Sequence, residues 1–130
     1  MKKVIPLLLL LFLFTGCGAS TETSSSYQQI SMEEAVSMME KEDSYILLDV
    51  RTVEEFEERH IPGAINIPNE TISSEEIPEL PDKNQLILVY CRSGNRSKQA
   101  SQKLAQQGYT NIVEFGSIND WTGETVSGLS

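Results

Sequence analysis

A cysteine, a glycine and two arginines lie within six residues in the stretch VYCRSGNRS, residues 89–97. The stretch follows an apolar run and precedes a helical pattern, and free backbone N–H groups at such a junction point toward one spot. Gly94 allows the sharp bend, and the positive charges of Arg92 and Arg96 favour the thiolate form of Cys91. We therefore predict that Cys91 is a nucleophile beside an anion-binding loop. The candidate anion-binding residues are Arg92, Ser93, Gly94, Asn95, Arg96 and Ser97.

Cysteine is scarce in this chain, which contains only Cys17 and Cys91. If Cys17 carries a lipid, Cys91 has no intramolecular partner, so a disulfide framework and a Cys-x-x-Cys redox pair are excluded. A metal site needs more ligands than Cys91 and the single histidine, His60, so we expect neither a metal nor another cofactor. The alternative is an inert, buried Cys91 that acts as a small hydrophobic residue. Its charged, glycine-containing surroundings argue against that alternative.

The first residues, MKKVIPLLLLLFLFTGC, have the pattern of a targeting segment. Two lysines precede an apolar run from Val4 to Phe14, which is shorter than the ~20 residues that a membrane-spanning helix needs. LFTGC resembles the lipobox of bacterial lipoproteins, in which the cysteine is lipidated and becomes the mature N-terminus. We expect residues 1–16 to be a signal peptide and a lipid on Cys17 to anchor an extracytoplasmic protein to the cell membrane. An ordinary secretory signal with a chance cysteine is the alternative.

The formal net charge of −9 limits the partners of the protein. Nucleic acids and anionic lipid surfaces attract basic patches, so we expect no nucleic-acid partner and membrane contact only through the lipid on Cys17. Residues 17–26 are small and polar and predict a flexible tether. The remaining residues, 27–130, are enough for one domain, which we expect to be a monomer.

Two capping-box patterns predict the first helices of this domain. Ser31 with Glu34 predicts a helix to about Glu42, and Thr52 with Glu55 predicts a short acidic helix that ends near His60. A third helix is predicted over the polar stretch NRSKQASQKLAQQG, because its few apolar residues recur at helical spacing before a terminal glycine.

Continuous apolar runs at 45–50 and 85–90 predict strands that are buried on both faces. Shorter strands are predicted at 63–68 and 111–115, and helical turns at 72–80 and 118–121. Short buried strands that alternate with helices predict an α/β fold, with a small, mostly parallel sheet flanked by helices on both faces. Ligands bind beyond the carboxyl ends of such strands, which is where Cys91 stands.

The loop CRSGNR after an apolar strand resembles the active-site loop of the rhodanese-fold sulfurtransferases. The resemblance covers about residues 28–126 and includes LLDVR, EFEERHIPGAINIP and GYTNIVEFGSINDWTG in the family's order. Ser117 departs from the pattern, because many members have a second glycine there. The resemblance implies a rhodanese-like domain over residues 27–130. It also implies that Cys91 takes sulfur from an anionic donor such as thiosulfate, becomes a persulfide, and passes the sulfur to a small thiol or a protein acceptor.

Roles are also expected for other residues in and around these motifs. Arg92 and Arg96 are candidates for binding the anionic donor. Asp49 and Arg51 either orient the loop or form an ion pair that fixes the turn after their strand. His60 is expected to be structural, because it follows a helix in a structural motif. The acidic residues of the second helix are expected to form a solvated face: Glu54, Glu55, Glu57 and Glu58.

A phosphatase or a binding module fits the cysteine loop less well than a sulfurtransferase does, and a persulfide carrier fits it equally well. A phosphatase or arsenate reductase of the dual-specificity type would have one more residue between cysteine and arginine, and histidine in the place of Tyr90. A persulfide carrier without turnover, or a binding module on the same fold, would keep the same loop, although a binding module has no need of Cys91. The sequence leaves the carrier open and identifies neither the donor nor the acceptor.

Overall fold

The structure is a computed structural model that describes residues 26–129. The predicted signal peptide, Cys17 and nearly all of the predicted tether lie outside the described residues. Within residues 26–129, no helix has both the length and the apolar character needed to cross a membrane.

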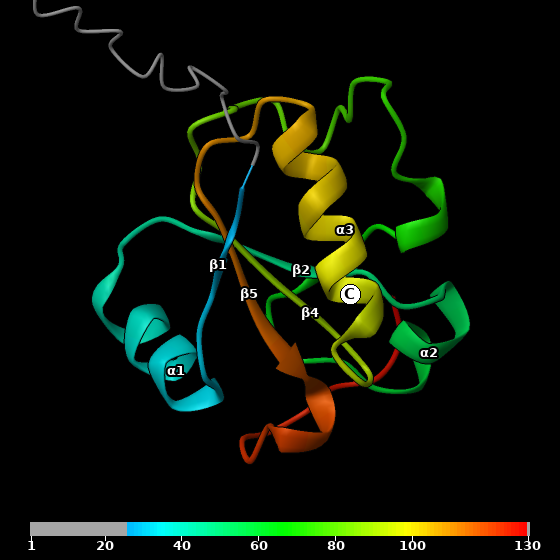
Figure 1. The fold of residues 1–130 in the computed structure, drawn as a ribbon. Coiled ribbons are helices and arrows are strands. Elements are labelled where there is room, and N and C mark those ends of the chain that lie inside the picture. The colour runs from blue at the N-terminus through cyan, green and yellow to red at the C-terminus, as the bar shows by residue number, and fades with distance from the viewer. Residues whose placement is uncertain (1–25, 130) are drawn as a thin grey trace, which may run out of the picture.

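Five strands form one parallel sheet in the order β1-β5-β4-β2-β3 (Figure 1). The strands are β1 (Gln28–Gln29), β2 (Ile46–Asp49), β3 (Ile65–Asn66), β4 (Ile87–Cys91) and β5 (Ile112–Ser117). The central strand, β4, is buried at every position, as its continuous apolar sequence predicts. All five strands end at the same edge of the sheet, and Cys91 is the last residue of β4.

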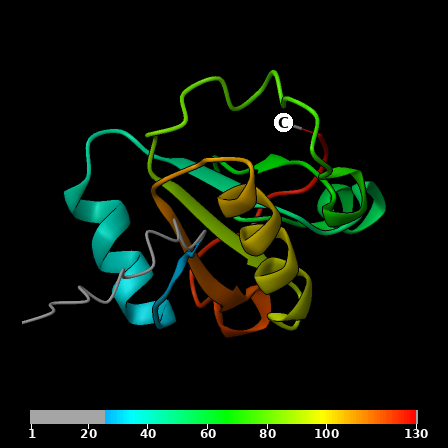
Figure 2. The same ribbon diagram turned by 45° about the horizontal axis from the view of Figure 1, so that its top comes forward.

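The helices are α1 (Met32–Lys41), α2 (Val53–Glu58) and α3 (Asn95–Gln106), with short 3-10 helices η1 (Asn69–Thr71) and η2 (Ile118–Asp120). Figure 2 shows α1 and α3 on opposite sides of the sheet, which confirms the predicted α/β arrangement. Both capping boxes also form as predicted. The side chain of Ser31 accepts a hydrogen bond from the Glu34 N–H, and that of Thr52 accepts one from the Glu55 N–H.

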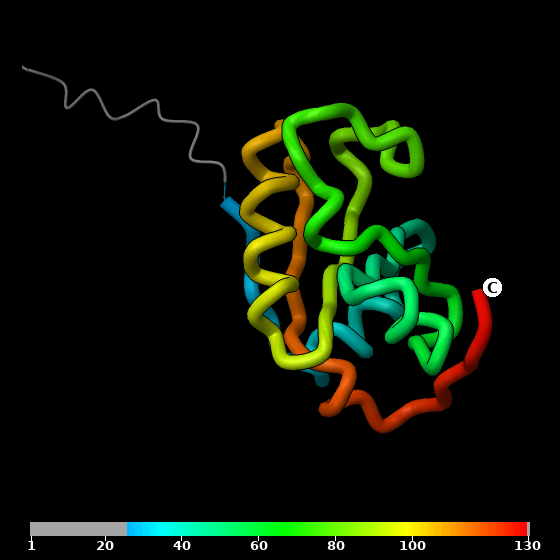
Figure 3. Tube along the Cα trace, turned by 90° about the vertical axis from the view of Figure 1, so that its right-hand side faces the viewer, coloured from blue at the N-terminus to red at the C-terminus, as the bar shows by residue number. Residues whose placement is uncertain are grey.

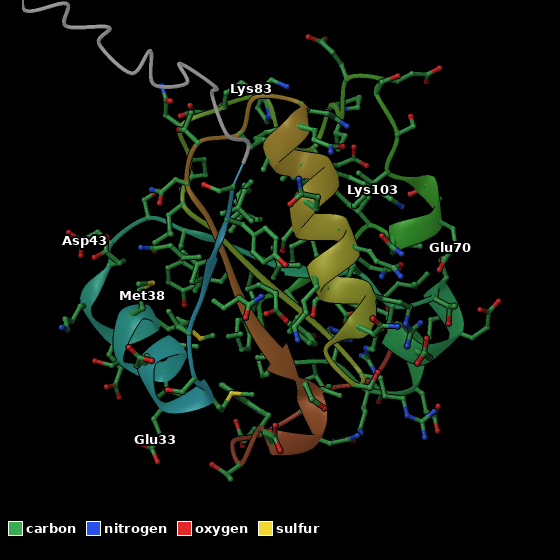
Figure 4. The ribbon with its side chains drawn as sticks, in the orientation of Figure 1. Glu33, Met38, Asp43, Glu70, Lys83 and Lys103 are labelled. Carbon is green, nitrogen blue, oxygen red and sulfur yellow. The ribbon has the colours of Figure 1, made fainter. Side chains whose placement is uncertain are left out.

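The sheet separates two apolar cores. On the α3 face, Cys91 packs in one cluster with Val89, Ala100 and Leu104, while Phe115 belongs to the cluster on the α1 face. Figure 4 labels Lys103 on α3 and Glu70 in η1, on the same side of the molecule. There the ammonium group of Lys103 donates hydrogen bonds to the main-chain and side-chain oxygens of Asn69, at 2.9 and 3.1 Å.

One predicted element is wrong. The segment 72–80 forms no helical turn, and the 3-10 helix η1 precedes it. Pro78 disfavours the helical conformation of Ile77, and burial of Ile72 and Leu80 anchors the segment as an irregular cover of the α3-side core. The predicted turn at 118–121 is η2. After it, the chain crosses the end of the molecule and Val126 pairs with His60 (Figure 3).

Candidate active site

The loop between β4 and α3 wraps around the sulfur of Cys91. The residue is fully buried, and its Sγ accepts a hydrogen bond of 2.8 Å from the Gly94 N–H. Gly94 is the N-cap residue of α3 and has a φ of +93°, a backbone conformation that glycine adopts without strain. The amino end of a helix carries partial positive charge, so this geometry favours negative charge on the sulfur. The predicted nucleophile therefore sits where an anion is stabilised.

A buried carboxylate lies behind this loop. The Cys91 thiol is 3.3 Å from Ser97 Oγ, and Ser97 Oγ is 2.5 Å from Glu114 Oε2. The same carboxylate oxygen accepts a hydrogen bond of 2.9 Å from the Gly116 N–H, and Glu114 is only 3% exposed. Glu114 was not among the residues predicted for the site. The sequence signal that could have found it is a single charged residue among the apolar residues of IVEF, 112–115.

Arg96, predicted as a donor-binding residue, is held by an acidic side chain. Its guanidinium contacts both carboxylate oxygens of Glu55 on α2, at 2.6 and 3.0 Å. The hydrogen bond from Arg96 lowers the pKa of Glu55 to about 2, and the same bond raises the pKa of Arg96. The expectation that Glu55 belongs to a solvated face is therefore wrong, whereas its three acidic neighbours on α2 are exposed. Whether Arg96 contacts a donor stays a prediction.

Arg92 differs from Arg96 because its side chain is exposed. Its carbonyl oxygen is fixed by two donors, the hydroxyl of Ser117 and the side-chain amide of Asn119, the second at 3.2 Å. Ser117, the departure from the family pattern, thus ties β5 to the active-site loop. Arg92 also borders a depression of about 270 Å³ that carries charges of both signs. The depression is lined by Arg51, Glu55, Glu58, Arg59, Arg92, Ile118 and Asn119.

Asp49 and Arg51 form a buried ion pair at the end of β2. Arg51 Nη2 is 2.7 Å from Asp49 Oδ2, and it also donates to the carbonyl oxygen of Arg59 at 2.6 Å. The Arg51 main-chain N–H donates to Asp49 Oδ1 at 2.9 Å. These contacts link the turn after β2 to the end of α2. Among residues 26–129, neither side chain forms a hydrogen bond or an ion pair with Cys91.

The remaining residues considered in the sequence are His60 and the loop residues Ser93 and Asn95. His60 is buried, stacks on Phe56 with ring centroids 3.6 Å apart, and its Nδ1 lies 2.8 Å from the Phe56 carbonyl oxygen. Ser93 and Asn95 are exposed at the rim of the loop. In the described part of the chain, no three His, Cys, Asp or Glu side chains gather as a metal site would require.

A parallel α/β sheet with a cysteine-bearing loop at its carboxyl edge defines a known class of domain. The family model described as a rhodanese-like domain matches residues 31–124. The chain therefore belongs to the rhodanese-like family, and its fold is the rhodanese fold. This agrees with the resemblance found in the sequence.

Curated relatives include both sulfurtransferases and a sulfur carrier. The chain is 37% identical over 81 residues to the thiosulfate sulfurtransferase PspE of Escherichia coli, covering 62% of this chain and 78% of PspE. It is 36% identical over 115 residues to the putative sulfur carrier protein YrkF of Bacillus subtilis, covering 88% of this chain. The match spans only 61% of YrkF. It is also 30% identical over 122 residues to the yeast thiosulfate:glutathione sulfurtransferase, covering 83% of this chain and 87% of that protein.

Solved structures give the same classification. An E. coli rhodanese with bound anions has a TM-score of 0.60 at 37% identity, and the match covers 65% of this chain and all of that one. A human single-domain sulfurtransferase, TSTD1, has a TM-score of 0.65 at 27% identity, with 74% of this chain and 96% of that chain covered.

Proposed function

We propose that this protein is a sulfurtransferase that moves a sulfane sulfur through a persulfide on Cys91. The observation that carries the proposal is the sulfur of Cys91 at the amino end of α3, with the Gly94 N–H 2.8 Å away. The same backbone groups that favour a thiolate also favour the anionic persulfide that follows it. Relatives named thiosulfate sulfurtransferase support the choice of an anionic donor of the thiosulfate class.

The two half-reactions balance without a cofactor. The Cys91 thiolate attacks the outer sulfur of thiosulfate, the S–S bond of the donor breaks, and sulfite leaves with the electron pair. Cys91 is then a persulfide anion. An acceptor nucleophile, such as cyanide or a thiolate, attacks the terminal sulfur and Cys91 leaves as a thiolate, ready for the next cycle. Arg92, with its exposed side chain beside the loop, supplies positive charge for the incoming anion.

The test uses the full-length chain in detergent with Cys17→Ser, so that Cys91 is the only thiol. After incubation with thiosulfate, the intact mass should increase by one sulfur atom, and added cyanide should release thiocyanate over many cycles. The matched control carries Cys17→Ser together with Cys91→Ser and should do neither. If the Cys91 protein gains no sulfur from thiosulfate or polysulfide, the proposal is wrong.

A stoichiometric sulfur carrier is the second candidate function. It is favoured by the relative named as a putative sulfur carrier, to which this chain is 36% identical. Cys91 is also the only cysteine in residues 26–129, so that region holds no second thiol to release the persulfide. A sulfur adduct that forms normally but yields no more than one thiocyanate per protein would support the carrier and direct the search to a protein acceptor.

We also propose that the protein is an extracytoplasmic lipoprotein anchored through Cys17. The support is the sequence LFTGC after the apolar run. Expressed in a bacterium that is fed labelled palmitate, the full chain should incorporate label and lose residues 1–16, and the Cys17→Ser variant should do neither. Export and cleavage without label would instead indicate an ordinary secretory signal.

A further inference from the structure

A continuous line of hydrogen bonds leads from the sulfur of Cys91 to the carboxylate of Glu114. It runs from Cys91 on β4 to Ser97 on α3 at 3.3 Å, and from Ser97 to Glu114 on β5 at 2.5 Å. All three residues are buried, with exposures of 0%, 0% and 3%. The elements β4, α3 and β5 therefore each contribute one residue to a buried chain of hydrogen bonds on the α3 face of the sheet.

The direction of these hydrogen bonds follows from the number of protons available. Ser97 has one hydroxyl proton and two acceptors, Glu114 Oε2 at 2.5 Å and the Gly94 carbonyl oxygen at 3.1 Å. The charged and closer acceptor is the stronger one, so the hydroxyl donates to Glu114. Ser97 Oγ is then free to accept the proton of the Cys91 thiol, 3.3 Å away.

We propose that Glu114 is the acceptor of the Cys91 proton, acting through Ser97. The thiol proton moves to Ser97 Oγ while the hydroxyl proton of Ser97 moves to Glu114 Oε2. Two bonds to hydrogen break and two form, the negative charge moves from the carboxylate to the sulfur, and no external base is needed. Glu114 is thus a positioning residue that promotes the thiolate form of Cys91, and Ser97 relays the proton from Cys91 to Glu114. The use of that thiolate for sulfur transfer rests on the proposed function.

The surroundings of the line favour this charge movement. The amino end of α3 and the Gly94 N–H stabilise the charge when it is on Cys91. The Gly116 N–H stabilises it when it is on Glu114, at 2.9 Å. A buried carboxylate with only a few polar partners and an ionised thiol nearby would repel each other, so sharing one proton is the arrangement that burial favours.

The active-site loop holds two basic residues beside this line. The guanidinium of Arg96 is bonded to Glu55 of α2, and Arg92 is exposed. On the other side of β5, strand β1 presents only Gln28 and Gln29. No other carboxylate is bonded to Ser97 within the described residues.

A purely structural role for Glu114 makes a different prediction. The sheet register shifts between Val89 and Tyr90, so that Val89 pairs with Glu114 and Tyr90 with Gly116. The hydrogen bond from the Gly116 N–H to Glu114 stabilises this bulge. Glutamine can accept the same bond, but it cannot take the proton of Ser97. A Glu114→Gln variant therefore separates the two roles.

The experiment measures thiolate formation on Cys91 in the full-length Cys17→Ser chain. The rate of alkylation by iodoacetamide is recorded at about pH 6, where an ordinary thiol is mostly protonated. The wild-type protein should react readily, because in the proposal Glu114 has taken the proton of Cys91. Glutamine cannot take this proton, so alkylation in Glu114→Gln should be about tenfold slower.

Two serine variants test the relay itself. Ser97→Ala breaks the line while it leaves Glu114 in place, and its alkylation should be slowed as in Glu114→Gln. Ser97→Thr keeps the hydroxyl and should restore the wild-type rate. Unchanged melting temperatures verify that each variant is folded. An alkylation rate in Glu114→Gln equal to or above that of the wild type would overturn the proposal, and so would a wild-type rate in Ser97→Ala.

The readout does not depend on sulfur transfer. Slower alkylation in Glu114→Gln and Ser97→Ala, together with no uptake of sulfur from thiosulfate or polysulfide by the wild type, would support the relay and remove the sulfurtransferase proposal. Sulfur transfer by the wild type with equal alkylation rates in all of these proteins would do the reverse.

Discussion

The carboxylate of Glu55 on α2 and the guanidinium of Arg96 on α3 form a two-pronged ion pair, with contacts of 2.6 and 3.0 Å. The pair brings α2 against the first turn of α3, where Arg96 follows Cys91 by five positions. It also means that one of the two arginines in the loop is neutralised before any substrate arrives. The net positive charge that an anionic donor meets is therefore set by a glutamate outside the loop.

Replacing that glutamate should strengthen donor binding. In Glu55→Gln the guanidinium of Arg96 loses its charged partner and an anionic donor no longer approaches a carboxylate. We expect the KM for thiosulfate to fall about threefold at low salt, which corresponds to about 0.7 kcal/mol, and the effect to fade as salt screens the charges. The matched control is Glu54→Gln, an exposed neighbour that removes the same charge. An equal change in both variants would indicate a general charge effect and contradict the specific role of Glu55.

The same ion pair should make the free energy of unfolding depend on pH in the acidic range. The hydrogen bond from Arg96 lowers the pKa of Glu55 from 4.5 to about 2 in the folded protein. A lowered folded-state pKa gives stability that is fully present above the unfolded-state value and is lost as the pH falls toward the folded-state value. We expect the urea midpoint of the wild type to drop between pH 4.5 and 2 by more than that of Glu55→Gln. Parallel curves for the two proteins over this interval would show that the pair contributes nothing.

Gly94 offers a test of the loop geometry, and Gly108, just beyond the other end of α3, offers a matched control. Its φ is +93°, and a Cβ there would meet only the Gly116 Cα at 3.8 Å, so Gly94→Ala introduces strain without a clash. We expect a loss of about 1–2 kcal/mol in stability and a drop in kcat, because relief of the strain moves the Gly94 N–H away from the Cys91 sulfur. Gly108→Ala has a similar φ of +101° and open space around it. It should lose similar stability, measured by denaturant unfolding, but keep its kcat.

The parts of the site that could be predicted from the sequence are those encoded by neighbouring residues. In the capping box, Thr52 and Glu55 are three positions apart. The Cys91 loop is encoded by a strand, a glycine and a helix that follow one another closely in the sequence. Such patterns depend on local backbone geometry, which residue types reveal directly.

The contacts that could not be predicted join residues far apart in the chain. Glu55 and Arg96 are 41 positions apart, and Ser97 and Glu114 are 17 apart. Glu114 also lies next to a register shift that places Gly116 opposite Tyr90, and no local pattern specifies that shift. A charge in an apolar strand indicates that a partner exists, but only the packing of α3 on β5 identifies it as Ser97.

Ser117 should stabilise the active-site loop through the carbonyl of Arg92. Its hydroxyl donates to that oxygen and accepts a hydrogen bond of 3.0 Å from the Asn119 N–H. Removing both bonds in Ser117→Ala should lower stability by about 1 kcal/mol and speed amide hydrogen exchange in residues 92–95. Ser127→Ala, an exposed position in the C-terminal segment, is the control and should leave the exchange unchanged. Equal exchange rates in the wild type, Ser117→Ala and Ser127→Ala would mean that the hydroxyl of Ser117 does not stabilise the loop.

The isolated thiol of Cys91 should make the protein sensitive to peroxide. Cys91 is the only cysteine in the described residues, so a sulfenic acid formed on it has no nearby thiol in that region with which to form a protective disulfide. Mild peroxide should therefore abolish thiocyanate production, and a small thiol added afterwards should restore it by reducing the sulfenic acid. The protein loaded with thiosulfate before exposure provides the internal comparison. Its terminal sulfur is oxidised in place of Sγ, so more activity should return after thiol treatment. Full activity after peroxide without any thiol would contradict a reactive Cys91.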